Sequence, residues 1–202
     1  SALAQEPVAG SDAAPTAIDA QADLHINELM ADNKVTLADP DEPGEVPDWL
    51  EIYNPTASPV SLNGLALTDD PENLIKFPIT NGVTIPAHGF LVFYADEDPR
   101  QGPTHTNFKL SQSGEYIALV RVEPLGIIDD FDFPALQTDQ SYGRLPDGSP
   151  TLKILDFATP GSANGGDPPR ILSVSKPPVP APANLPVTVT AIITDIDAIA
   201  TA

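Results

Sequence analysis

Most of this chain consists of short runs in which apolar and polar residues alternate. Each run ends at Pro, Gly, Asn or Asp. No run keeps helical periodicity over the ~11 residues needed to recognise an amphipathic helix. Short strands separated by turn residues are typical of an antiparallel β-sandwich or barrel. The 24 prolines agree with this pattern, because proline in a sheet protein is confined to turns and edges. The sequence therefore predicts an all-β fold.

The clearest strand covers residues 48–53 and contains the only tryptophan of the chain. Alternation places Leu50 and Ile52 on one face of this strand. The other face carries Trp49, Glu51 and Tyr53. Asn54 and Pro55 then end the strand.

A second strand is predicted for residues 24–30, where alternation puts Leu24, Ile26 and Met30 on one face. Glu28 falls on that same face. A carboxylate among apolar neighbours is costly to bury alone. We therefore expect Glu28 to be paired, bound to a cation, or displaced by a β-bulge.

Further strands are predicted between turn residues along the chain. They cover residues 60–62, 65–68, 74–77, 83–85, 90–94, 107–110, 115–121, 127–133, 171–175 and 186–194. The run at 90–94 is apolar on both faces, which indicates a central strand.

Composition divides the chain into four parts. Residues 1–22 lack aromatic residues and periodicity, which is typical of a flexible tether. Residues 23–164 form the main domain, and residues 165–169 are rich in Gly and Pro and read as a linker. Residues 170–202 offer only two strands, so we interpret them as the start of a second, truncated β module.

The formal charge of −20 repels phosphate and anionic lipid, so nucleic acid is not expected as a direct partner. The chain has no cysteine, which excludes thiol catalysis and disulfides. No run reaches the ~18 apolar residues of a membrane span. Ala2-Leu3-Ala4 has the small-x-small form of a signal-peptidase site, so we expect a secreted or cell-surface protein.

Several short motifs follow one another within residues 24–164. They are INELM (26–30), DWLEIYN (48–54), LNG (62–64), LTDD (67–70), FP (77–78), HTNFKLS (105–111), GE (114–115), SYGR (141–144), DG (147–148) and TPGSAN (159–164). Together they resemble the bacterial secreted form of the lamin-tail domain family. The resemblance implies an immunoglobulin-like antiparallel β-sandwich without enzymatic activity of its own.

Bacterial members of that family sit in exported multidomain proteins beside hydrolases or repeated immunoglobulin-like modules. The chain from residue 169 onward resembles the first strands of such a repeat. The resemblance therefore implies a non-catalytic binding, targeting or spacer module. Two alternatives are an accessory domain of an exported nuclease or phosphoesterase, and a spacer made rigid by calcium.

Calcium is the cofactor that the acidic loops suggest, because Ca²⁺ prefers oxygen ligands. Asp39 and Asp41 begin a loop like that of an EF-hand, but Pro43 and Leu50 occupy positions where that loop needs ligands. A non-helical site could instead combine a loop carbonyl with three carboxylates, those of Glu28, Asp48 and Glu51. The competing interpretation makes Asp48 a hydrogen-bonding residue at the start of its strand and Glu51 a cross-strand partner of Lys or Arg.

No catalytic residues are predicted, since the sequence contains no serine-nucleophile motif and no metal-binding histidine spacing. Trp49 and Tyr53 share a face and could stack on a sugar, although packing inside the protein explains them equally. His105 lies in the HTNFKLS motif, where it binds a ligand or holds a loop by a hydrogen bond. A protein or glycan at the cell surface is the expected partner, and the oligomeric state stays open.

Overall fold

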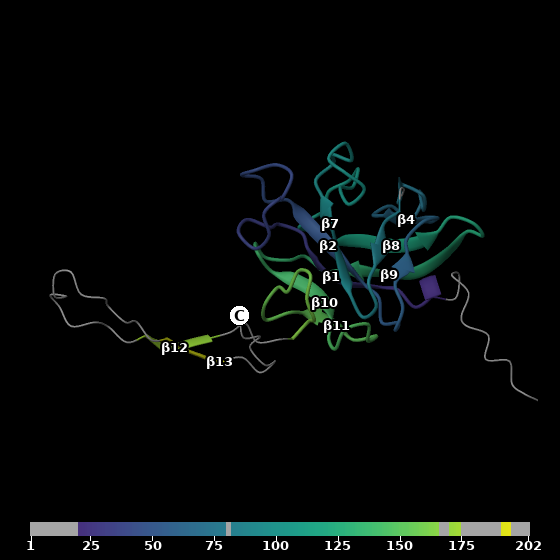
Figure 1. Ribbon diagram of the computed structural model, residues 1–202. Helices are drawn as coiled ribbons and strands as arrows, with labels where there is room; N and C mark the ends of the chain where they lie inside the picture. Colours follow the sequence, from purple (N-terminus) through teal and green to yellow (C-terminus); the bar gives the residue numbers. More distant parts are fainter. Residues whose placement is uncertain (1–19, 80–81, 166–169, 175–190, 195–202) are drawn as a thin grey trace, which may run out of the picture.

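The structure is a computed structural model that describes residues 20–79, 82–165, 170–174 and 191–194 (Figure 1). Residues 1–19 of the predicted tether and 166–169 of the predicted linker lie outside these ranges, as do residues 175–190 and 195–202. No helix in the described part of the chain is long and apolar enough to cross a bilayer.

Five antiparallel strands form the first sheet, in the order β11-β10-β1-β2-β7. Their bounds are Leu152–Ile154, Ser141–Arg144, His25–Met30, Asp48–Tyr53 and Phe90–Ala95. The second sheet has the order β5-β4-β8-β9. Its strands are Phe77–Pro78, Leu65–Thr68, Glu115–Arg121 and Gly126–Phe133.

Two small pairs complete the described strands. β3 (Val60–Ser61) pairs with β6 (Thr84–Ile85), and β12 (Arg170–Val174) pairs with β13 (Ala191–Thr194). The β12–β13 pair agrees with the two strands predicted beyond the linker, although residues 186–190 of the second one lie outside the described ranges.

The two large sheets pack face to face over one apolar core. Leu50 and Ile52 of β2 and Leu67 and Leu119 of the second sheet belong to this core and are fully buried. The alternation predicted for residues 48–53 is confirmed, since Trp49 lies outside this cluster. The molecule is an immunoglobulin-like antiparallel β-sandwich, as predicted.

A β-bulge at Asn27 decides which way β1 presents its side chains. Ile26 is paired with Ile52, but Glu28 is paired with Glu51, so one extra residue lies on β1. The bulge moves Glu28 off the core face, which was one of the three outcomes expected for it. Met30 moves with Glu28 to the outer face, so its predicted place beside Ile26 is wrong.

A buried ion pair joins the two sheets at this bulge. The guanidinium of Arg144 on β10 donates to Asp129 on β9 at 2.7 Å and to the carbonyl of Ile26 at 3.0 Å. The other oxygen of Asp129 accepts the Ile26 N–H at 2.8 Å. The Ile26 N–H that the bulge frees is therefore satisfied by Asp129 of the opposite sheet, and the Ile26 carbonyl by Arg144 of the same sheet.

The structure corrects the central position predicted for residues 90–94, because β7 is an edge strand. The rings on its outer face are partly buried by stacking, Phe90 on Tyr53 and Tyr94 on His105 of the loop after β7. The loop also binds the strand edge, since Tyr94 N–H donates to the Thr104 carbonyl and Thr106 N–H donates to the Tyr94 carbonyl, both at 2.8 Å.

Residues 107–110 form no strand, contrary to prediction. Phe108 and Leu110 are apolar because they enter the core from a loop. In contrast, β10 and β11 were not predicted as strands. β10 contains Gly143, and the short β11 leaves Lys153 and Ile154 exposed, so neither strand shows clear alternation.

Candidate functional site

Two glutamates face each other on the outer side of the first sheet. Glu28 of β1 and Glu51 of β2 are directly paired in the strand register, and both are fully buried. Cβ atoms of directly opposed residues lie about 4.5 to 5.5 Å apart, so the two carboxyl groups are neighbours. We call Glu28 and Glu51 the carboxyl pair.

The carboxyl pair binds residues 159–164, which we call the anchor segment. The Thr159 N–H donates to both oxygens of Glu28, at 3.2 and 3.1 Å, and the Thr159 Oγ lies 3.0 Å from Glu28 Oε2. The Gly161 N–H donates to Glu51 Oε2 at 2.5 Å. The TPGSAN motif is therefore a segment whose backbone N–H groups are taken up by buried carboxyl oxygens.

A third carboxylate and two asparagines complete this network. Asp147 Oδ1 accepts the Asn164 N–H at 2.8 Å and an Asn27 Nδ2–H at 2.9 Å. Asn164 Nδ2 donates to the carbonyls of Asn27 and Arg144, at 3.0 and 2.8 Å. The bulge at Asn27, the turn at Asp147 and the anchor segment are thus fixed to one another.

Gly143 allows this close approach. A Cβ atom at this position would lie 2.4 Å from the Asn27 carbonyl oxygen and 3.0 Å from Asn164 Nδ2. Only glycine fits between β1 and the anchor segment, which explains the glycine of the SYGR motif.

Burial raises the pKa of Glu51 to about 8, and the charges of Glu28 and Asp147 act in the same direction against the hydrogen bonds from Gly161 and Asn27. The pKa of Glu28 is also raised, again chiefly by burial, against hydrogen bonds from Ser141 and Thr159. Two neighbouring buried carboxyl groups titrate as a pair rather than singly.

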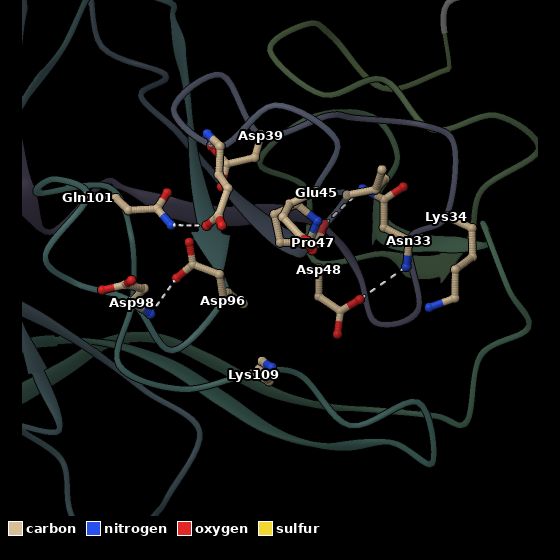
Figure 2. Close-up of a pocket in the computed structure, with 13 residues that line it drawn as sticks. Asn33, Lys34, Asp39, Glu45, Pro47, Asp48, Asp96, Asp98, Gln101 and Lys109 are labelled. Carbon is tan, nitrogen blue, oxygen red and sulfur yellow. Dashed lines mark hydrogen bonds between the residues drawn. The ribbon is translucent and has the colours of Figure 1, made fainter.

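Asp48, the third residue of the expected calcium site, lies elsewhere. It is three positions from Glu51 along β2, so the two side chains point to opposite faces. Its carboxylate accepts the Asn33 N–H at 3.0 Å (Figure 2). The expected site of Glu28, Asp48 and Glu51 thus has no support in this geometry.

Trp49 and Tyr53 do not form an exposed platform. The Trp49 side chain is fully buried, between its register partners Met30 and Tyr94. Tyr53 is half-buried and stacks on Phe90, with 4.7 Å between the ring centroids. The packing interpretation accounts for both aromatic residues.

His105 lies at the centre of a second charged group. It is 1% exposed, its Nδ1 lies 2.6 Å from Asp96 Oδ2, and its Nε2 lies 3.2 Å from Asp41 Oδ2. Asp39 Oδ2 is 3.9 Å from Nδ1, and the Tyr94 ring stacks on the imidazole. We call Asp39, Asp41, Asp96 and His105 the loop cluster.

The surroundings of His105 raise its pKa. Burial lowers the pKa, but the hydrogen bonds to Asp96 and Asp41 and the charges of Asp96 and Asp39 outweigh burial. Asp39 also folds the acidic loop, since its Oδ1 accepts the N–H groups of Asp41 and Glu42 at 2.7 and 3.1 Å. The histidine thereby joins the loop after β1 to the loop after β7.

A pocket of about 380 Å³ opens between these two loops (Figure 2). Gln101 spans the loops by donating to Glu42 at 2.8 Å. Two lysines, Lys34 and Lys109, line the pocket. Six acidic residues outnumber them, namely Asp39, Glu42, Glu45, Asp48, Asp96 and Asp98.

Sequence reasoning identified His105 but missed its partners. Asp41 is 64 residues away from His105, and Asp96 is nine residues away. Two sequence features pointed to these partners. Asp39 and Asp41 begin a loop that resembles an EF-hand but lacks its later ligands, and Asp96 begins an acidic turn. Nothing in the sequence showed that both would meet the same imidazole.

Comparison with protein families gives one match, to the model described as Lamin Tail Domain, over residues 18–132. Comparisons with curated proteins and with solved structures give no match. The matched range covers more than half of the chain and contains β1 to β8 and most of β9. The motifs at 141–144 and 159–164 lie beyond it, where β10 pairs with β1 and the anchor segment binds the carboxyl pair. The chain belongs to the lamin tail domain family.

Proposed function

We propose that this chain is a non-catalytic binding and connecting module of an exported multidomain protein. An immunoglobulin-like domain of this family is compatible with a binding or spacer role. The resemblance of residues 24–164 to exported bacterial members supports the exported context. Loops on a rigid sandwich are a common place for recognition.

The pocket between the two loops is the observation that carries this proposal. Its lining has six carboxylates against two lysines, so it favours a positively charged group. A Lys or Arg side chain presented by a protein partner fits this chemistry. The formal charge of −20 supports the same choice, because it disfavours anionic ligands.

Fluorescence anisotropy with a labelled oligolysine peptide tests the pocket. We expect binding at low salt that weakens at about 0.15 M salt, where surface charges are screened beyond ~8 Å. The double variant Glu42→Gln/Glu45→Gln changes two exposed carboxylates of the pocket. It should weaken binding well beyond the matched control.

The matched control is Glu72→Gln/Glu123→Gln, which removes the same charge from exposed positions that do not line the pocket. Equal loss of binding in both double variants would show that overall charge, and not the pocket, attracts the peptide. A labelled oligoglutamate peptide should not bind any of the variants.

The loop cluster favours a second function, a spacer stabilised by a divalent cation. Ligand atoms of Asp39, Asp41 and His105 lie within 4.8 Å of one another. Carboxylate oxygens suit Ca²⁺, and an added imidazole nitrogen suits Zn²⁺. Asp96 on Nδ1 leaves Nε2 directed toward Asp41, an arrangement that orients histidine ligands in many metal sites.

Calorimetric titration of chelator-treated protein with Ca²⁺, and separately with Zn²⁺, tests the cation function. Binding should release or absorb heat until saturation and should raise the melting temperature, since the ion prefers the folded state. Asp41→Asn should abolish both effects. If the heat and the rise in melting temperature are lost in Asp48→Asn but kept in Asp41→Asn, the site expected from the sequence, with Glu28, Asp48 and Glu51, would be favoured instead. If neither ion gives heat or a higher melting temperature, this function is excluded.

A further inference from the structure

The hydroxyl group of Thr159 contacts two oxygen atoms at once. Its Oγ lies 3.0 Å from Glu28 Oε2 and 2.8 Å from Asn164 Oδ1. A hydroxyl group has one proton to donate, so it can serve as donor in only one of these contacts.

The amide of Asn164 decides which contact receives that proton. Both Nδ2 protons of Asn164 are used, because Nδ2 donates to the carbonyls of Asn27 and Arg144. This fixes the orientation of the amide, so Oδ1 must accept. The Thr159 hydroxyl therefore donates to Asn164, and the contact with Glu28 is a hydrogen bond only if Glu28 itself supplies a proton.

The charges around Glu28 also favour a protonated carboxyl group. Glu51 faces it from β2 and Asp147 faces it from the turn after β10. The hydroxyl group of Ser141 and the N–H and hydroxyl groups of Thr159 are polar partners of Glu28, but none of them carries a positive charge. Among the described residues, none of the ion pairs involves Glu28, Glu51 or Asp147. Three carboxyl groups without a cationic partner cannot all ionise cheaply.

The oxygens of Glu51 differ from those of Glu28 in their partners. Glu51 Oε1 accepts an N–H from Asn27 at 3.2 Å, and Oε2 accepts the Gly161 N–H at 2.5 Å. Each oxygen of Glu51 therefore has an N–H donor of its own, which suits a carboxylate, whereas the two oxygens of Glu28 share the single N–H of Thr159. Burial raises the pKa of both glutamates, in agreement with one proton retained by the pair.

We propose that the carboxyl pair holds one proton at neutral pH, that this proton lies on Glu28 in the contact with Thr159 Oγ, and that the anchor segment is bound less tightly as rising pH removes it. The inference is independent of the proposed pocket, since it concerns the opposite acidic region. It makes the anchor segment a pH-sensitive connection.

Release of the anchor segment changes the reach of the chain. Six residues, 159–164, are freed ahead of β12. At about 3.3 to 3.6 Å per extended residue, they add roughly 20 Å to the connection between the sandwich and the β12–β13 hairpin. The pH would thus set how far the following strands can move from the sandwich.

Carboxyl ¹³C NMR of the full chain, with labelled glutamate, tests the position of the proton. Glu28 should give a protonated signal at pH 7, and Glu28→Gln should remove that signal. Titration of both glutamates below about pH 5.5 would overturn the proposal, because exposed glutamates titrate near 4.3. A proton found on Glu51 with Glu28 ionised would overturn the assignment to Glu28.

Amide hydrogen exchange of residues 159–164 tests the release. The quantity measured is the equilibrium constant for release of the anchor segment. If the bound segment retains one more proton than the released one from pH 6 to 8, this constant rises about tenfold per pH unit, or about 100-fold over the range. Rates are corrected for intrinsic exchange, and peptides from β8 report on the folded core. Protection that stays constant over this range would overturn the proposal.

Two variants sharpen the exchange experiment. In Glu28→Gln the Gln side chain can donate to Thr159 Oγ at every pH, so this variant should remove most of the pH dependence of exchange. The control Glu72→Gln, at an exposed position, should leave that dependence unchanged. Thr159→Val removes the hydroxyl group but keeps both glutamates, and it should lower protection already at pH 6. Unchanged protection in Thr159→Val would overturn the proposed contact even if Glu28→Gln did not fold.

Discussion

The carboxyl pair and the loop cluster are both rich in acidic residues, but they are neutralised in different ways. Glu28 and Glu51 are fully buried and are held by hydrogen bonds within the protein, without a cationic partner among the described residues. The carboxylates of the loop cluster surround a histidine and border an open pocket. Acidic residues on the same sandwich therefore serve different purposes.

The difference follows from solvation. A buried carboxyl group without a cation is more stable when it keeps its proton, so the carboxyl pair acts as a hydrogen-bonding anchor. Asp41 is exposed and lies beside an imidazole, so the loop cluster keeps its charge where a ligand can reach it. The cationic partner His105 and the exposure of Asp41, rather than the number of acids, separate the candidate binding site from the anchor.

The largest expected effect comes from Trp49→Ala, which should disturb both regions. The indole lies on the same face as Glu51 and next to Tyr94, which stacks on His105. Removing a buried ring of this size should cost about 3 to 5 kcal/mol of unfolding free energy. Denaturant unfolding measures the loss, and the exposed Val35→Ala should show none. An unchanged midpoint for Trp49→Ala would contradict its buried position.

The second-largest expected effect is a dependence of folding stability on pH, which arises from the carboxyl pair. Burial raises the pKa of Glu51 from 4.5 to about 8 and also raises the pKa of Glu28, so between these values the folded carboxyl pair keeps a proton that the unfolded chain has lost. Stability should be full below pH 4.5 and fall as the pH rises toward 8, by on the order of 3 kcal/mol.

Thermal melting of the wild type and Glu51→Gln at a series of pH values from 5 to 9 measures this slope. His105 also has a raised pKa and contributes in the same direction, so the difference between the two proteins isolates the carboxyl pair. A variant with the same slope as the wild type would contradict the buried proton.

His105→Gln should have a smaller effect, confined to the loop cluster. The variant leaves Asp96 with a neutral partner, which should cost about 1 to 2 kcal/mol of unfolding free energy. Amide exchange should rise in residues 39–47 and 102–106 but not in the anchor segment. Faster exchange in the anchor segment would show that the two acidic regions are coupled.

Lys34→Ala should have no measurable effect on stability. Lys34 lies 2.7 Å from Asp32, but its side chain is 64% exposed, and exposed ion pairs contribute little. Urea unfolding should give the same midpoint as the wild type. A clear loss would show that charge at the pocket rim also supports the fold.

Local patterns predicted an antiparallel β-sandwich or barrel, and the resemblance to the lamin-tail domain family specified the immunoglobulin-like sandwich. Alternation in residues 48–53 gave β2 and its buried face, and the misplaced carboxylate of Glu28 pointed to the bulge. The same local view failed for β7, an edge strand whose outer rings Phe90 and Tyr94 stack on Tyr53 and His105. An apolar pattern in a strand indicates that a face of the strand is covered. It does not identify the part of the protein that covers it.

The candidate sites depend on contacts that no local pattern reports. Thr159 is 131 residues from Glu28, and Asp41 is 64 residues from His105. Local sequence features assign each of these residues a role of its own, such as a turn or a linker. Only the fold shows that TPGSAN is bound by buried carboxyl groups and that two acidic loops share one histidine.

The loop along β7 has a consequence for chains at high local concentration. An unpaired strand edge can join the edge of another copy and start aggregation. Thr104 and Thr106 occupy the hydrogen-bonding groups of Tyr94, and at the other end of the sheet β11 is only three residues long. The Tyr94 end of β7 is therefore closed to a neighbouring copy and β11 offers only a short edge, which limits edge-to-edge pairing where many copies are packed densely on a surface.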